Sequence, residues 1–260
     1  MRVYRVTRNE GVGRAYPCAT EVPPPFWADG LALSRSWFAE NLGKYVEGFH
    51  VENGEGEVVG HIYWAPSERA LVPYRIEEGA AYVYCEWVQR GHQGRGYMRE
   101  VFGAFVEYLR GKKCKGVLVD GTEIEGYMHY RHFEKRGFRV ICEADGGRLM
   151  YLPLSQERIE VEPIEARISK REGLPVEVLV IGSQFCPVGA SAVLAIRRVA
   201  GEFEGKVVVK EVAGGREAIE RYGVADGIFV NGEARFFGPV REEQVREVLR
   251  EAIGSAKVQT

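Results

Sequence analysis

The chain has 260 residues, a net charge of −2 and 45% hydrophobic residues, which suits one large or two small globular domains. The chain lacks the excess of basic residues that would indicate a nucleic-acid partner. Its apolar runs are all shorter than the roughly 18 residues that would span a bilayer. The five cysteines (Cys18, Cys85, Cys114, Cys142 and Cys186) form no C-x-x-C pair, so neither a disulfide framework nor a zinc site is expected. The first residues predict a strand instead of a signal peptide, and we expect a cytoplasmic protein.

The first quarter of the chain predicts a strand, a loop, a helical segment and a hairpin. In chain order these are a strand at 1–7, a loop at 8–25, a helical segment at 26–42 and hairpin strands at 45–52 and 57–64. The helical segment has an interruption at Gly30. The hairpin is indicated by two apolar runs joined through Asn53-Gly54-Glu55-Gly56.

A glycine-rich turn between a strand and a helix lies at the centre of this sequence. Residues 80–88 are rich in aromatic and β-branched residues and predict the strand. From Met98 to Leu109 the apolar residues recur at the spacing of one helix face. The first N–H groups of a helix have no intrahelical partner, and the helix dipole adds partial positive charge there. The turn therefore predicts an anion site, most naturally for a phosphate or pyrophosphate.

Two common phosphate-binding motifs do not fit this turn. Neither G-x-G-x-x-G nor G-x-x-x-x-G-K-[ST] has its spacing here. What is present is Gln93-x-x-Gly96-x-Met98, which begins five residues after Val88. This pattern resembles the [QR]-x-x-G-x-[GA] motif of the GNAT superfamily of N-acetyltransferases, with Met98 in place of a small residue. A plain glycine-rich β–α turn is the alternative.

The elements after the central helix extend the resemblance. They are a strand at 115–120, a helix at 125–136 and two strands at 138–143 and 149–154. Their order resembles the GNAT fold, whose central sheet opens near its fourth strand. Phe133-Glu134-Lys135-Arg136-Gly137-Phe138 resembles the second signature of the family, Y-E-K-x-G-F. The predicted fold class is therefore α/β, with a GNAT-like mixed sheet over residues 1–155.

The resemblance implies that acetyl-CoA is the acetyl donor and that the backbone amides of the turn hold its pyrophosphate. The residues that it assigns to the cofactor are Trp87, Val88, Gln93, Gly94, Arg95, Gly96, Tyr97, Met98 and Phe133. Arg90 and Arg95 would add positive charge near the phosphates, with solvated surface arginines as the alternative. The implied acceptor is a small-molecule or peptide amine, without nucleic acid or membrane as partners. The oligomeric state stays open, a homodimer included.

Acetyl transfer to an amine needs a base, donors for the oxyanion and a proton for the leaving thiolate. Glu86 is the candidate base, because a strand glutamate near this place has that role in a number of GNAT enzymes. The alternative is a glutamate on the sheet paired with a nearby arginine. The usual general acid of the family is a tyrosine, and Phe133 stands in its place. Tyr130 is the candidate replacement, and His129 and His132 on the same helix are others; rings that only pack or face solvent are the alternative.

Residues 20–45 are expected to build the acceptor site together with the strand ends. The aromatic residues of this segment are Phe26, Trp27, Trp37, Phe38 and Tyr45. Most are expected in the core, and an aromatic-lined pocket would suit an amphipathic amine.

The pattern restarts after a charged linker at 156–174. The predicted elements of residues 175–260 are a buried strand at 176–181, a helix, a strand at 206–212, a helix at 216–222, strands at 228–230 and 234–237, and a helix at 241–253. Asn231-Gly232 indicates a hairpin. This βαβαββα order, with Cys186-Pro187 at the first helix, resembles the thioredoxin superfamily.

The redox motif of that superfamily is incomplete here. Cys186-Pro187-Val188-Gly189 stands where a dithiol enzyme has C-x-x-C, and Ala225-Asp226-Gly227 replaces its cis-proline segment. Cys186 could still have a depressed pKa at a helix N-terminus and act as a catalytic thiol. The leading hypothesis is an acetyl-CoA-dependent N-acetyltransferase with a thioredoxin-like second domain. The alternatives are a thiol or redox protein acting through Cys186 and a non-catalytic acyl-CoA sensor.

Overall fold

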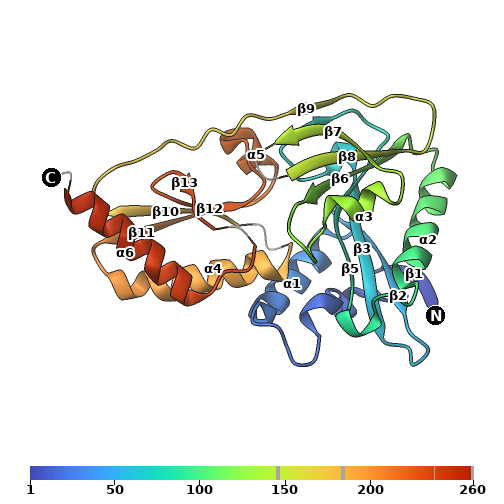
Figure 1. The fold of residues 1–260 in the computed structure, drawn as a ribbon, viewed down its shortest axis with the longest axis horizontal. Coiled ribbons are helices and arrows are strands. Elements are labelled where there is room, and N and C mark those ends of the chain that lie inside the picture. The colour runs from blue at the N-terminus through green and yellow to red at the C-terminus, as the bar shows by residue number, and fades with distance from the viewer. Residues whose placement is uncertain (145–146, 183–184, 237, 259–260) are drawn as a thin grey trace. The chain divides into compact units, whose positions relative to one another are not determined.

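The computed structural model describes residues 1–144, 147–182, 185–236 and 238–258 (Figure 1). The chain divides into two compact units. The first contains Met1–Glu21, Phe38–Ala70 and Arg75–Glu162, and the second contains Val22–Trp37, Leu71–Tyr74 and Pro163–Thr260. The domain boundaries predicted at 155 and 174 stay a prediction.

A seven-stranded mixed sheet forms the first unit. Its strands are β1 (Arg2–Arg5), β2 (Glu47–Glu52), β3 (Val58–Pro66), β5 (Ala81–Val88), β6 (Gly116–Thr122), β7 (Arg139–Ala144) and β8 (Gly147–Pro153). Their order across the sheet is β1-β2-β3-β5-β6-β8-β7, and β5 and β6 are its parallel pair. The predicted hairpin is confirmed, because β2 and β3 pair antiparallel on either side of residues 53–57. The short strands β4 (Tyr74–Ile76) and β9 (Val161–Pro163), which pair with each other, were not expected from the sequence.

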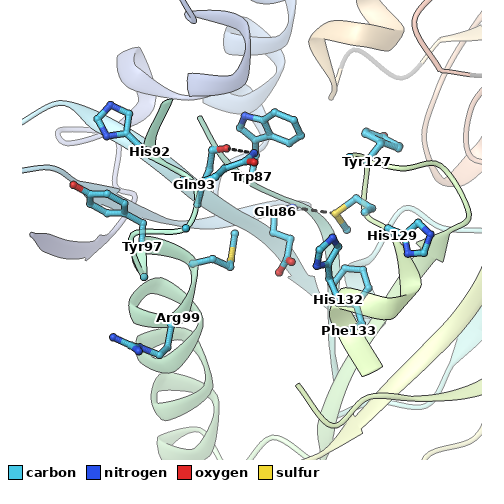
Figure 2. A pocket seen from close by; sticks show the side chains of 16 residues that line it. Glu86, Trp87, His92, Gln93, Tyr97, Arg99, Tyr127, His129, His132 and Phe133 are labelled. Carbon is cyan, nitrogen blue, oxygen red and sulfur yellow. Dashed lines mark hydrogen bonds between the residues drawn. The ribbon is translucent and has the colours of Figure 1, made fainter. Parts of the chain in front are cut away.

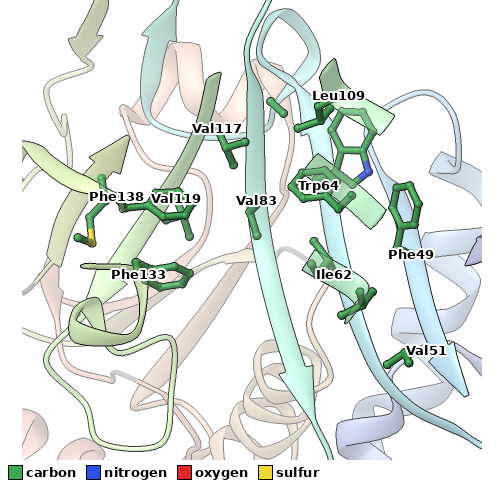
Figure 3. Close-up of a cluster of buried hydrophobic side chains, with 14 of the residues drawn as sticks. Phe49, Val51, Ile62, Trp64, Val83, Leu109, Val117, Val119, Phe133 and Phe138 are labelled. Carbon is green, nitrogen blue, oxygen red and sulfur yellow. The ribbon is translucent and has the colours of Figure 1, made fainter. Parts of the chain in front are cut away.

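Helix α2 (Tyr97–Gly111) packs on one face of this sheet, as its apolar stripe predicts. Figure 3 shows the core beneath it, where Phe49, Trp64 and Val83 come from three neighbouring strands. Phe105 of α2 meets the rings of Phe49 and Trp64 at centroid distances of 5.9 and 5.5 Å. This packing fixes the start of α2 at the end of β5.

The helix predicted at 125–136 is much shorter in the structure. Helix α3 covers only Tyr130–Glu134. Gly126 and Met128 have positive φ angles of 77° and 46°, which a right-handed helix cannot contain. Residues 124–128 are therefore a turn, and α3 begins at Tyr130, with His129 as the N-cap whose side chain accepts the Arg131 N–H.

The second unit has a four-stranded sheet of order β11-β10-β12-β13. Its elements are β10 (Val176–Gly182), α4 (Pro187–Ala200), β11 (Val207–Ala213), α5 (Arg216–Tyr222), β12 (Gly227–Val230), β13 (Glu233–Ala234) and α6 (Glu242–Val258). Strand β10 is parallel to β11 and antiparallel to β12, so the predicted βαβαββα order is present. The predicted last strand is shorter than expected, and its end at Phe237 lies outside the described residues.

Residues from the first part of the sequence belong to this second unit. The segment 22–37 carries a 3-10 turn, Ala28–Gly30, and the start of α1 (Leu31–Asn41). The Gly30 N–H donates to Ser191 Oγ at 2.8 Å, and the Ser191 hydroxyl donates to the Trp27 carbonyl at 2.6 Å. The interruption predicted at Gly30 is therefore a packing site against α4.

The predicted linker is ordered along part of its length. The Arg167 N–H donates to the Tyr222 carbonyl at 2.7 Å, and the Arg171 N–H donates to the Asn231 carbonyl at 3.0 Å. This segment therefore packs on the second unit instead of spanning open solvent. Among the described residues, no helix is both long and apolar enough to cross a membrane.

Candidate active site

The parallel strands β5 and β6 separate from each other partway along β5. Their pairing joins Ala81–Val83 to Val117–Val119, whereas β5 continues to Val88. Beyond the paired part, β6 stays with β8 and β5 stays with β3. One edge of the second half of β5 therefore faces an opening in the sheet.

A cavity of about 470 Å³ lies at this opening (Figure 2). Its walls come from the end of β5, the turn and first residues of α2, and the segment around the start of α3. They are Glu86, Trp87, Val88, His92, Gln93, Gly94, Gly96, Tyr97, Met98, Arg99, Gly126, Tyr127, Met128, His129, His132 and Phe133. The cavity thus unites most of the residues that the sequence assigned to a cofactor.

The glycine turn has the geometry of an open helix N-terminus. Gly94 and Gly96 have φ angles of 73° and 84°, a region that favours glycine. Gln93 Nε2 donates to the Val88 carbonyl at 3.0 Å and closes the turn. Gly96 is the N-cap of α2, and no side chain caps the helix. The first N–H groups of α2 are therefore left for an anion.

The positive charge at this turn differs from the prediction. Arg95 and Arg90 are not among the residues that line the cavity, whereas Arg99, in the first turn of α2, is. The Arg99 side chain is 83% exposed and pairs with Glu100 at 3.4 Å. Sequence reasoning missed Arg99, although its place three residues after Gly96 was a usable signal.

Glu86 lies in the wall of the cavity as an ion pair. Its side chain is 10% exposed, and both carboxylate oxygens accept hydrogen bonds from the Arg136 guanidinium, one of them at 2.8 Å. The guanidinium also lies over the rings of Phe102 and Phe133, 4.6 and 4.9 Å from their centroids. The carboxylate is thereby held in one orientation beside the cavity.

The indole of Trp87, which also lines the cavity, is held by Glu21. Its Nε1–H donates to Glu21 Oε1 at 3.0 Å, and the Arg90 backbone N–H points to the same oxygen at 3.3 Å. Glu21 therefore ties the end of β5 to the turn that follows it.

The α3 segment brings imidazoles, and not the Tyr130 phenol, to the cavity. Tyr130 does not line it: Arg148 lies over its ring at 4.0 Å, and Arg131 Nε donates to its hydroxyl at 3.2 Å. Hydrogen bonds from the Arg131 and Arg148 side chains lower the pKa of Tyr130, and the one from Arg131 has the larger effect. His129 and His132 do line the cavity, as does the buried Phe133.

The predicted acceptor segment is divided between the two units. Phe38 and Tyr45 belong to the first unit, where Phe38 is fully buried. Phe26, Trp27 and Trp37 belong to the second, where the rings of Phe26 and Trp27 meet at 5.1 Å. Their role in an acceptor site stays a prediction.

Cys186 lies in the second unit as the N-cap of α4. Burial raises the pKa of its thiol, and the Val188 and Gly189 N–H groups act in the opposite direction. The net direction is opposite to the depressed pKa that a reactive thiol needs. No group of three or more His, Cys, Asp or Glu side chains in the described parts of the chain is arranged to hold a metal ion.

A known protein family matches the first part of the chain. A family model described as Acetyltransferase (GNAT) family matches residues 14–138. Among solved structures, the ribosomal-protein-S18-alanine N-acetyltransferase from Escherichia coli is 15% identical, with 60% of this chain and 96% of that one covered and a TM-score of 0.42. A GNAT family acetyltransferase from Brucella melitensis, in complex with acetyl-CoA, is 18% identical, with 60% and 91% covered and a TM-score of 0.38. No curated protein matches the chain.

Proposed function

Since residues 14–138 are an acetyltransferase domain of the GNAT family, we propose that the cavity beside β5 binds acetyl-CoA and presents its thioester to an amine. The chain is an acetyl-CoA-dependent N-acetyltransferase. Its acceptor is an amine, and we propose an amphipathic one, because the segment expected to build the acceptor site is rich in aromatic residues.

The open N-terminus of α2 is the observation that carries the cofactor site. Uncapped N–H groups and the helix dipole favour an anion at Gly94–Gly96, where the pyrophosphate would lie. Trp87, Val88, Tyr97, Met98 and Phe133 would then flank the rest of the cofactor, since all five line the same cavity. Arg99, in place of Arg95, would supply the side-chain cation near the phosphates.

Direct attack of the amine on the thioester is the proposed chemistry. The amine must lose a proton, and Glu86 is the carboxylate in the cavity wall. Its bidentate pair with Arg136 fixes the carboxylate but occupies both oxygens. A base at this position must therefore share or release Arg136 when the acceptor binds.

The cofactor site is tested by placing a carboxylate where the phosphates would lie. Gly96→Glu should weaken acetyl-CoA binding by about a hundredfold, ~2.7 kcal/mol, measured by calorimetry. Gly96→Gln is the matched control, because it places a neutral side chain of the same size on the same positive-φ backbone and so separates the charge from the backbone strain. Equal affinities of the two variants, or no binding by the wild type, would contradict this site.

The role of Glu86 is tested by Glu86→Gln, which keeps the shape and removes the charge. With an amine from an acceptor screen, kcat should fall by about 10²- to 10⁴-fold while acetyl-CoA affinity stays close to that of the wild type. Unchanged kcat would leave Glu86 as a structural partner of Arg136. Binding without turnover on every amine would favour the acyl-CoA sensor.

For the second unit we propose a thioredoxin-like fold without dithiol chemistry. The strand order β11-β10-β12-β13, with one parallel pair, supports this fold. The raised pKa of Cys186 and the missing second cysteine argue against disulfide exchange. Its proposed role is to hold residues 22–37, which belong to the same unit.

A further inference from the structure

The leaving thiolate needs a proton or a positive charge, and the position of the usual tyrosine cannot supply either. Phe133 has no hydroxyl, and its ring is only 1% exposed within the core. In the proposed function the phosphates lie at the turn, so the thioester lies toward the other end of the cavity. That end is formed by the α3 segment, which Figure 2 shows across the cavity from Tyr97 and His92.

Three side chains of this segment have ionisable protons and line the cavity: Tyr127, His129 and His132. Both ring nitrogens of His129 are engaged. Its Nδ1 accepts from the Arg131 backbone N–H at 3.2 Å, and its Nε2 lies 3.4 Å from the Glu125 carboxylate. His129 therefore caps α3 and has no proton directed at the cavity.

The imidazole of His132 is in a different situation. Its ring packs edge-on against His129, with centroids 6.2 Å apart. Neither of its ring nitrogens makes a hydrogen bond within the part of the chain that the structure describes. His132 is exposed and lies in the cavity wall, one residue before Phe133. It thus offers a free N–H at the end of the cavity where the sulfur would lie.

We propose that His132 is the general acid that protonates the coenzyme A thiolate. This inference rests on the proposed function. The amine nitrogen attacks the carbonyl carbon, and the carbon–sulfur bond breaks with its electron pair going to sulfur. Sulfur takes the proton of the His132 imidazolium, and the amine proton goes to the base. The products are the amide, coenzyme A thiol and a neutral imidazole, which solvent reprotonates.

The test uses coenzyme A alone, so no acceptor is needed. The thiol of bound coenzyme A is titrated by its ultraviolet thiolate absorbance in wild type and His132→Phe. When a thiol and an imidazole interact directly, the first proton lost by the pair leaves a thiolate beside an imidazolium, as in paired cysteine–histidine sites. The bound thiol should therefore ionise about one to three pH units lower in wild type than in the variant. Equal titrations would overturn the assignment.

Two further variants make the test specific. His92→Phe removes an imidazole from the turn side of the same cavity and should titrate like wild type. The bound thiol could instead ionise at a higher pH than in wild type in Tyr127→Phe, and at the wild-type pH in His132→Phe. That result would assign the acid to Tyr127 and overturn the proposal. Calorimetry separates the two levels: no coenzyme A binding by wild type would overturn the proposed function and this inference with it. Binding with equal titrations overturns only His132.

Discussion

Helices α2 and α4 each follow a strand in the chain, and their N-termini differ in what surrounds them. Helix α2 begins at Gly96, with no side-chain cap and a cavity in front of it. Helix α4 begins after Cys186, and residues 27–30 pack against its first turns. Both look like ligand or reactive sites in the sequence. Among the described residues, the start of α2 lines a cavity, whereas the backbone of Trp27 and Gly30 bonds to Ser191 in α4, so the local pattern needs the tertiary structure to decide its use.

The largest expected effect comes from the packed helix start. At Gly30 an added Cβ would lie 2.7 Å from Ser191 N and 2.9 Å from Ala190 Cβ, and would also meet the Pro187 carbonyl oxygen. Gly30→Val should therefore lower the free energy of unfolding by about 3 kcal/mol or more, because helix backbone cannot move aside easily. Denaturant unfolding measures this. Gly13→Val is the control, since no atom lies within 4 Å of its Cβ position, and an equal loss there would contradict the packing argument.

A smaller loss of stability is expected beside the cavity, where the substitution breaks an ion pair and does not push against helix backbone. Arg136→Met leaves the Glu86 carboxylate, 10% exposed, without its two hydrogen bonds. The free energy of unfolding should fall by about 2 kcal/mol at neutral pH. Adding Glu86→Gln should restore part of this loss, because the uncompensated charge is gone. Additive losses in the double variant would show that the two side chains do not depend on each other.

These cases also show which features of the structure could be predicted from the sequence. The turn at Gln93–Met98 could be predicted because a strand, glycines and a helix stripe are all local signals. The pairing of Glu86 with Arg136 joins residues 50 positions apart, and that of Gly30 with Ser191 joins residues 161 apart. Neither contact leaves a periodic signal in the chain.

The prediction of Tyr130 as the general acid shows a second limit of the sequence. A helix from 125 to 136 made Tyr130 a reasonable substitute for the missing tyrosine. Because Met128 has a positive φ, α3 starts later, and His132 lines the cavity in place of Tyr130. Which face of a short helix meets a cavity depends on where the helix begins, and helix ends are poorly encoded in sequence.

The Cys186 thiol at the start of α4 should react slowly with alkylating agents. Burial raises the pKa of Cys186, so its thiolate fraction at neutral pH is below that of a free cysteine. Its alkylation, followed by peptide mass spectrometry, should be slower than that of N-acetylcysteine. Cys186→Ser should leave acetyl-CoA affinity unchanged. Alkylation faster than the free thiol would revive the redox hypothesis and remove the contrast between the two helix starts.

The smallest effect is expected on the outer side of α4, where charges meet solvent. Arg197 Nε donates to Glu211 Oε1 of β11 at 2.6 Å, and the two side chains are 49% and 37% exposed. The hydrogen bond from Arg197 lowers the pKa of Glu211. A lowered carboxylate pKa stabilises the fold above the unfolded pKa of about 4.3, and this stabilisation is lost as the pH falls through the folded pKa. Because solvent screens the pair, Glu211→Gln should cost less than about 1 kcal/mol at pH 7.

This difference between wild type and Glu211→Gln should shrink as the pH falls through the folded pKa of Glu211. Urea unfolding at pH 7 and near pH 3 would measure it, with Glu247→Gln as control, since Glu247 makes no ion pair among the described residues. A loss that persists unchanged in acid would mean that Glu211 acts through packing and not through its charge. The outer side of α4 would then resemble its tightly packed start, and not the solvated surface that its exposure indicates.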